Sequence, residues 1–294
     1  MDVAVVVARW FFFTAAMVAF GASLFPLYAG ADGIAERHPA ALRVFPLALG
    51  GIAMAAALGW IAALAADFSA GEGTDLIATI RLILFETSFG AAWLFRFAAL
   101  LLFLLVAAIR PKPLALVAVA TLLLAGEAWI GHAAAGGGVQ RLVQIVHLLA
   151  AGAWLGGLLP LALVLRDGAR RASAEEGARR AVLRFSAMGV VSVALIVLSG
   201  EASTWFVAGK LPGLSLPADD YDLVLGLKLA VFLAMVGLAL FNRFRLTPGL
   251  FDASPDRRRN VLHLFRRTVL VEQGLGFAVL LLAAVLGTTS PMPA

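Results

Sequence analysis

LLLAGEAWIGHAAAGGGVQRLVQIVHLLAAGAWLGGLLPLALVL, residues 122–165, is the stretch that decides the fold. Two long apolar runs flank the glycines Gly136–Gly138, whose missing Cβ atoms allow the backbone angles of a tight turn. Two of the four histidines of the chain, His132 and His147, lie on either side of this turn. An imidazole is costly in hydrocarbon, so a histidine within an apolar run indicates a functional site. The stretch predicts two antiparallel membrane helices with one histidine on each.

The two histidines of this hairpin lie at different depths. If the turn centres on the glycines, His147 lies opposite Glu127 and His132 lies opposite Arg141. At about 1.5 Å of rise per residue the histidines differ in depth by roughly 9 Å, more than two ligands of one metal ion allow. The two histidines are either successive binding sites, or a kink in a helix brings them together. His147 shares one helix face with Gln140, Gln144 and Trp154.

The composition is that of a polytopic membrane protein. Of 294 residues, 62% are hydrophobic and 14% are charged, whereas soluble domains are about half apolar and about a quarter charged. The predicted partner is the lipid bilayer. The net charge of +5 needs no nucleic acid, because the basic residues cluster between the apolar runs. The absence of Cys excludes disulfides, thiolate metal sites and cysteine redox chemistry.

Eight apolar runs approach the ~20 residues that a bilayer core requires. We therefore expect an all-α fold with eight transmembrane helices, forming a single transmembrane helical domain over residues 1–294. Residues 75–86 have apolar positions at helical spacing and predict a short interfacial helix between the second and third spans. The predicted spans are 3–28, 44–66, 89–109, 114–134, 139–165, 185–208, 222–241 and 267–287.

The basic residues predict the orientation, because Lys and Arg accumulate in cytoplasmic connections. Seventeen lie on one side of the predicted spans and two on the other, so both termini and the glycine turn are expected to be periplasmic. Most of the cytoplasmic set lies in a loop predicted over residues 166–184 and in the segment 242–267.

Polar residues inside the spans form a larger outer group and a smaller inner one. Buried charges in bilayers normally pair, so Glu127 and Glu201 are candidates for metal ligands or proton carriers, and equally for counter-ions of Arg9, Arg96 and Lys228. Glu201 and Lys228 match in depth, which predicts an ion pair between them. The candidate metal ligands are His132, His147, Glu127 and Glu201. The candidates for structural or gating roles are Trp154, Arg96, Lys228, Asn242, Arg243 and Glu272.

Motifs along most of the chain carry a family resemblance. They are Glu86-Thr87-Ser88-Phe89-Gly90 with Trp93 and Arg96, Gly131-His132-Ala133, the run from His147 to Leu158, Gly226-Leu227-Lys228-Leu229, Asn242-Arg243 with Pro248, and Val271-Glu272 with Gly274 and Gly276. In order and spacing these motifs resemble the CopD family of bacterial copper-resistance and copper-homeostasis membrane proteins, most strongly over residues 86–290. Tyr221-Asp222 departs from the expected Tyr-Gly, and Glu127 and Glu201 match no motif of the family.

The resemblance implies a multi-pass protein of the bacterial inner membrane that imports copper from the periplasm, often beside a small periplasmic copper-binding partner. The cargo is copper, as Cu(I) or Cu(II), which imidazole suits in either state. No nucleotide-binding loop or hydrolase motif is present, so we expect no enzyme activity.

Two alternatives stay open. The first is a membrane b-type haem protein that moves electrons or reduces metal. Axial ligation, however, needs facing histidines at matched depth, whereas His132 and His147 are offset and His38 and His263 lie at helix ends. The second alternative is a scaffold that docks a periplasmic copper protein without transporting copper.

Overall fold

The computed structural model describes residues 3–30, 39–73, 75–87, 89–109, 112–130, 137–208, 220–252 and 254–289. Within these ranges the chain is helical and contains no strand, which confirms the all-α prediction. The elements are α1 (Val3–Ala29), α3 (Pro39–Glu72), α4 (Leu76–Glu86), α5 (Gly90–Ala108), α6 (Pro113–Gly126), the 3-10 turn η1 (Glu127–Trp129), α8 (Gly138–Arg170), α9 (Ala172–Ala208), α10 (Asp220–Phe241), the π-helical turn η2 (Asn242–Leu246), α11 (Thr247–Gly249) and α12 (Pro255–Leu286).

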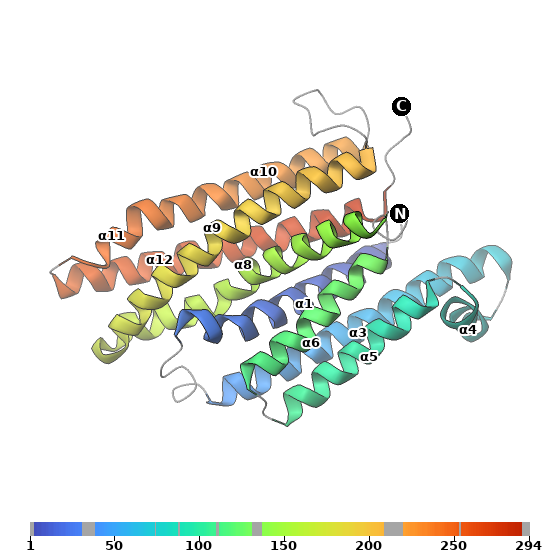
Figure 1. Ribbon diagram of the computed structural model, residues 1–294, viewed down its shortest axis with the longest axis horizontal. Coiled ribbons are helices and arrows are strands. Elements are labelled where there is room, and N and C mark those ends of the chain that lie inside the picture. The colour runs from blue at the N-terminus through green and yellow to red at the C-terminus, as the bar shows by residue number, and fades with distance from the viewer. Residues whose placement is uncertain are drawn as a thin grey trace.

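Long helices of alternating direction build the molecule, as Figure 1 shows. Seven helices of the described part are long and apolar enough to cross a membrane, so the polytopic membrane prediction is confirmed. The predicted span 114–134 is shorter in the structure, because α6 has 14 residues and η1 ends at Trp129. Residues 131–136, which include His132, lie outside the described residues. The count of eight spans stays a prediction.

Helix α1 occupies the middle of the bundle and contacts α3, α6, α8 and α12 (Figure 1). It crosses α8 at a point made of small residues. A Cβ atom at Gly21 would clash with the carbonyl oxygen of Gly152, and one at Gly156 would clash with the carbonyl oxygen of Met17. Glycine therefore permits the close approach of the two backbones, as small residues commonly do between membrane helices.

The short helix predicted over residues 75–86 is confirmed as α4, which runs across the ends of α3 and α5 (Figure 1). The carboxylate of Asp75 caps it by accepting from the backbone N–H groups of Ile77 and Ala78, at 3.1 and 3.2 Å. Such a cap supplies partners for amides that have none within the first helical turn.

The predicted loop over residues 166–184 is wrong. Helix α8 continues to Arg170 and α9 begins at Ala172, so Arg171 alone separates them. The segment is rich in Ala, Glu and Arg, which are strong helix formers. Ala174, Ala178 and Ala181 are buried along one face of the extension. Charge marks the end of a membrane span, but it does not end a helix.

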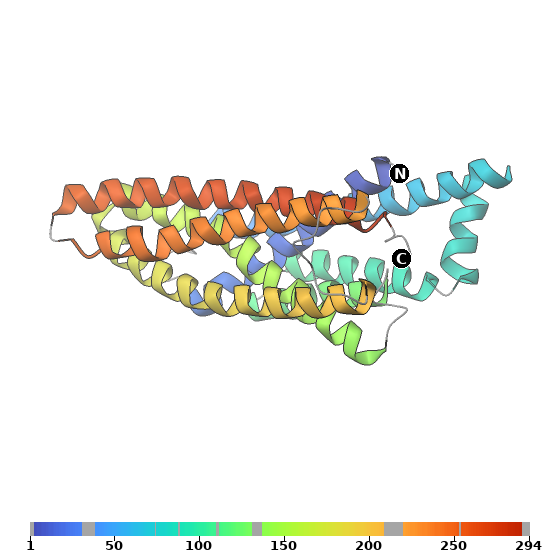
Figure 2. The same cartoon turned by 90° about the horizontal axis from the view of Figure 1, so that it is seen from above.

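Helices α9 and α10 frame the region of interest. Helix α9 packs on α8, whereas α10 packs on α12, and Figure 2 shows α10 and α12 in one layer with α9 in the opposite one. Between them is a cavity of about 290 Å³ with a mainly apolar wall drawn from α8, α9, α10, η2 and α12. We call the region between α9 and α10 that this cavity occupies the cleft.

Candidate functional site

His147 is partly buried on α8 and faces α9. Its Nδ1 lies 3.0 Å from the Oγ of Ser199. The hydroxyl of Ser199 has one proton, which it donates to the carbonyl oxygen of Leu195. Its oxygen is therefore left to accept a hydrogen bond from Nδ1–H of His147. This tautomer leaves the lone pair of Nε2 available, the usual arrangement of a metal-binding imidazole.

The surroundings of His147 differ from the predicted ones. The sequence placed it opposite Glu127, on the preceding helix, but its hydrogen bond runs to α9 instead. Its ring packs against the backbone there, because a Cβ atom at Gly200 would lie 3.7 Å from Cε1.

The predicted ion pair between Glu201 and Lys228 is wrong. Both side chains are described, and no salt bridge joins them. Glu201 is exposed. It follows Ser199 by two residues on α9, and two residues of an α-helix turn a side chain to nearly the opposite face. Because Ser199 faces His147, Glu201 points away from the imidazole.

Glu127 is buried against a different cation. The Nε and Nη2 atoms of Arg96 donate to its two carboxylate oxygens, at 2.9 and 2.6 Å. The rings of Phe12, Trp60 and Trp93 surround the guanidinium, with centres 4.8, 4.4 and 4.2 Å from its Cζ. Both oxygens of Glu127 are thus engaged, which favours the counter-ion alternative over a ligand role.

A second polar group lies at the wall of the cleft. Trp154 of α8 donates from Nε1 to Oε1 of Glu272 at 3.0 Å, and Asn242 donates from Nδ2 to Oε2 at 3.1 Å. Thr268 donates to Oδ1 of Asn242 at 2.6 Å, which fixes the orientation of the amide. Asn242 begins the π-helical turn η2, a feature that is frequent at functional sites.

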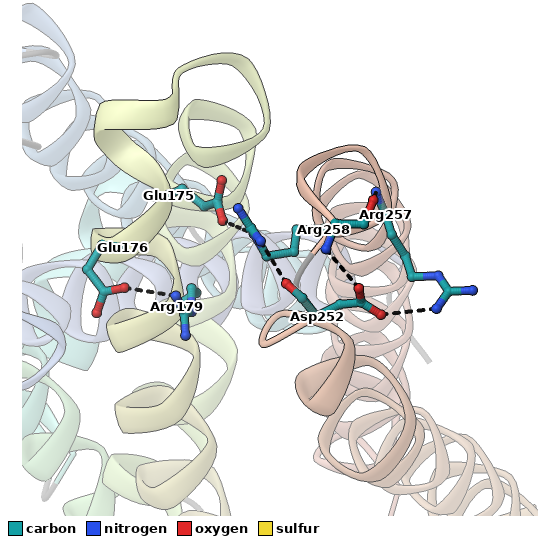
Figure 3. Close-up of polar contacts among 7 residues, drawn as sticks. Glu175, Glu176, Arg179, Asp252, Arg257 and Arg258 are labelled. Atoms are coloured by element: carbon teal, nitrogen blue, oxygen red, sulfur yellow. Dashed lines mark hydrogen bonds and ion pairs between the residues drawn. The ribbon is translucent and has the colours of Figure 1, made fainter.

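The arginine-rich end of the cleft is bridged by side chains. Arg243 donates from Nη1 to the Oγ and the carbonyl oxygen of Ser186 on α9, at 2.7 and 3.2 Å. Farther out, Arg258 of α12 pairs with Glu175 of α9, as Figure 3 shows. These contacts tie α9 to the connection between α10 and α12.

The two polar groups share one face of α8. His147, Trp154 and Leu161 are spaced by seven residues, close to two helical turns, and the last two line the cavity. The structure thus aligns His147 with Glu272, two residues that the sequence assigned to separate groups. Among the described residues, no three His, Asp or Glu side chains come together as a metal-binding group.

Ser199 was missed by the sequence analysis. A serine inside an apolar helix carries no distinctive signal, and the same short segment contains Glu201, whose charge draws more attention. Only the packing of α9 on α8 reveals which of the two side chains meets the imidazole.

The described histidines do not suit a haem with two histidine ligands. His147 and His263 lie seven residues from Trp154 and nine residues from Glu272, toward opposite ends of the antiparallel helices α8 and α12. At about 1.5 Å per residue they are separated by roughly 24 Å along the bundle, much farther than two axial ligands of one iron allow. His38 and His132 are outside the described ranges.

Comparisons with known proteins match nearly the whole chain to copper resistance proteins. A family model described as the N-terminal domain of copper resistance protein D-like proteins matches residues 1–143, and a model described as copper resistance protein D matches residues 179–286. The chain is 33% identical to copper resistance protein D of Pseudomonas syringae pv. tomato, over 97% of this chain and 96% of that protein.

Two further relatives match smaller shares. The inner membrane protein YebZ of Escherichia coli (strain K12) is 32% identical over 70% of each chain. The copper transport protein CutJ of Bacillus subtilis (strain 168) is 30% identical over 73% of this chain and 39% of that protein. No solved structure matches the chain.

Proposed function

Because this chain belongs to the copper resistance protein D family, we propose that it carries copper across the bacterial inner membrane, from the periplasm to the cytoplasm, and that His147 binds the ion on the way. The chain is a multi-pass protein of the inner membrane with a role in copper homeostasis. The direction of transport and the role of His147 as a copper ligand belong to the proposal.

The free Nε2 of His147 carries the proposal. When the Ser199 hydroxyl donates to Leu195, its oxygen accepts from Nδ1–H of His147, and that tautomer keeps the lone pair of Nε2 for a metal ion. Neutral imidazole binds copper in both oxidation states. The chain has no thiolate to retain Cu(I), and a transported ion must be able to leave its site.

Moderate affinity favours passage over storage. We also propose that a small periplasmic copper-binding protein delivers the ion, and that Glu127 and Glu201 are not ligands in the conformation described.

Copper uptake by proteoliposomes tests the proposal. His147→Ala should abolish uptake and copper binding, because the nitrogen ligand is lost. Ser199→Ala should lower copper affinity by roughly tenfold, the loss typical when the hydrogen-bond partner of a metal-binding histidine is removed. His263→Ala is the matched control, because His263 is exposed near the start of α12, far from His147.

Three outcomes would contradict parts of the proposal. Equal uptake by the wild type and His147→Ala would remove His147 from the path. Uptake only into vesicles with the cytoplasmic face outward would reverse the direction. Copper binding without uptake, in protein that is correctly folded, would favour the docking scaffold.

A further inference from the structure

Glu272 is a buried acid whose charge has no ion-pair partner among the described residues. It is 2% exposed in the middle of α12. Its two hydrogen bonds come from neutral donors, the indole of Trp154 and the amide of Asn242. An ionised carboxylate without a counter-ion is costly inside a membrane protein. The site therefore needs either a proton or a mobile cation.

The cavity beside Glu272 has room for the water that a proton exchange at its carboxyl group requires. Glu272, Asn242 and Trp154 supply polar atoms to a wall that is otherwise mainly apolar, around about 290 Å³. This volume is ample for several water molecules, which are retained where buried polar groups can bond to them. A carboxyl group at the wall can thus pass a proton to water in the cavity.

The charged and titratable groups around Glu272 do not neutralise it. Arg243 of η2 lines the same cavity, but its guanidinium is bonded to Ser186 and forms no described salt bridge with Glu272. Helix α9 contributes no charged residue to the cavity wall. The other charged or titratable groups on the neighbouring helices lie toward the end of the bundle where α1 and α8 begin. They are His147 on α8, Lys228 on α10 and Arg9 on α1, which contacts Gly287.

We infer that Glu272 is a proton-binding site and that its proton is released when copper enters the cleft. The inference deepens the proposed function and rests on it. The O–H bond of the carboxyl group breaks, its electron pair stays on the carboxylate oxygen, and the proton passes to water in the cavity. A positive ion in the cavity stabilises the carboxylate that remains. Copper passage is thereby coupled to protons.

Infrared difference spectroscopy of the purified full chain tests the inference without metal. A protonated carboxyl group should give a carbonyl stretch at neutral pH, and Glu272→Gln should remove this band. Glu86→Gln, an exposed position at the end of α4, is the matched control and should keep it. Trp154→Phe removes one hydrogen bond to the carboxyl group, so the band should move to higher frequency. It serves as a second variant if Glu272→Gln does not fold.

The second half of the experiment adds Cu(I), kept reduced with ascorbate. In the wild type the band should disappear, and a pH indicator should record a proton for each copper ion bound. Glu272→Gln should bind copper without releasing a proton, whereas His147→Ala should keep the band and not respond to copper.

The outcomes separate the inference from the proposed function. No carbonyl band at neutral pH, or a band that persists in Glu272→Gln, overturns the inference. Copper binding at His147 with no proton release overturns it as well and leaves the transport proposal intact. Failure of the wild type to bind copper overturns the transport proposal and with it the coupling. The metal-free band then still decides whether Glu272 holds a proton.

Discussion

Arg96 is the most deeply buried cation described, with an exposed fraction of 1%. Removing a guanidinium from water costs several kcal/mol even after the protein relaxes. Glu127 offsets part of that cost through its two short hydrogen bonds, and each surrounding aromatic ring contributes about 0.5–2 kcal/mol. The arrangement joins α1, α3, α5 and η1, so it holds the N-terminal half of the bundle together.

This geometry predicts strong coupling between the two side chains. Arg96→Met and Glu127→Leu should each lower the free energy of unfolding by ~3–5 kcal/mol, because each strands a buried charge. The double variant strands none and should lose less than the sum. Denaturation in detergent measures all three, with the exposed Arg81→Met on α4 as the control. Strictly additive losses would show that the ion pair does not stabilise the fold.

At the scale of elements, η2 shows how one irregular turn serves a site. A π-helical turn has one residue more than an α-helical turn. The backbone N–H of Thr247 donates to the carbonyl oxygen of Asn242, five residues earlier, and the Thr247 hydroxyl donates to the same oxygen at 3.0 Å. The extra residue rotates the following chain relative to α10. It leaves Asn242 directed at Glu272 while Arg243 reaches Ser186 on α9.

The start of α12 depends on Asp252 in the preceding connection. Its carboxylate accepts from the backbone N–H of Ser254 at 3.0 Å and from Arg257 at 3.1 Å (Figure 3). The Ser254 hydrogen bond first, and then the Arg257 guanidinium, hold the pKa of Asp252 below its usual value. A lowered pKa in the folded state means that the ionised form stabilises the fold. This stabilisation is complete above the usual pKa and is lost as the pH falls through the lowered one.

The amides at the start of α12 should therefore lose protection from hydrogen exchange as the pH falls below about 4, after correction for intrinsic exchange rates. Asp252→Asn should show low protection at every pH, since its side chain cannot ionise. Asp256→Asn, in the first turn of the same helix, serves as the control and should keep the pH dependence of the wild type. Unchanged protection down to pH values near 3 in the wild type would contradict the prediction.

At the scale of the whole molecule, the arginine-rich ends of α8, α9 and α12 lie together at one end of the bundle (Figure 1). The opposite end carries the starts of α1 and α8. This distribution agrees with the predicted orientation, in which the basic end faces the cytoplasm. In that orientation His147 lies toward the periplasm and the Arg243–Ser186 bridge lies toward the cytoplasm.

Cysteine labelling tests that orientation in a chain without native cysteines. Gly137→Cys lies at the start of α8 and Arg171→Cys lies between α8 and α9, and both positions are exposed. A membrane-impermeant thiol reagent should label position 137 in intact spheroplasts and position 171 only after the membrane is opened. The reverse pattern would invert the topology and place His147 near the cytoplasm.

The sequence by itself determined the class of the molecule, because hydropathy and charge report directly where a chain can lie relative to a bilayer. The all-α membrane class, the short helix α4 and the family resemblance all followed from the sequence. The same signals located His147 and Glu272, since polar groups are rare and costly in such helices.

Only the tertiary structure decided which side chains meet. It joined His147 to Ser199 and Glu127 to Arg96, and it left Glu201 exposed. The physical reason is that lipid and the interior of a helix bundle are both apolar, so hydrophobic periodicity does not show which face of a membrane helix turns inward. The rotation of each helix is set by close packing, such as the contact of Gly21 with Gly156. That packing alone brought Trp154 and Glu272 together at the wall of the cleft, with His147 about two helical turns away along α8.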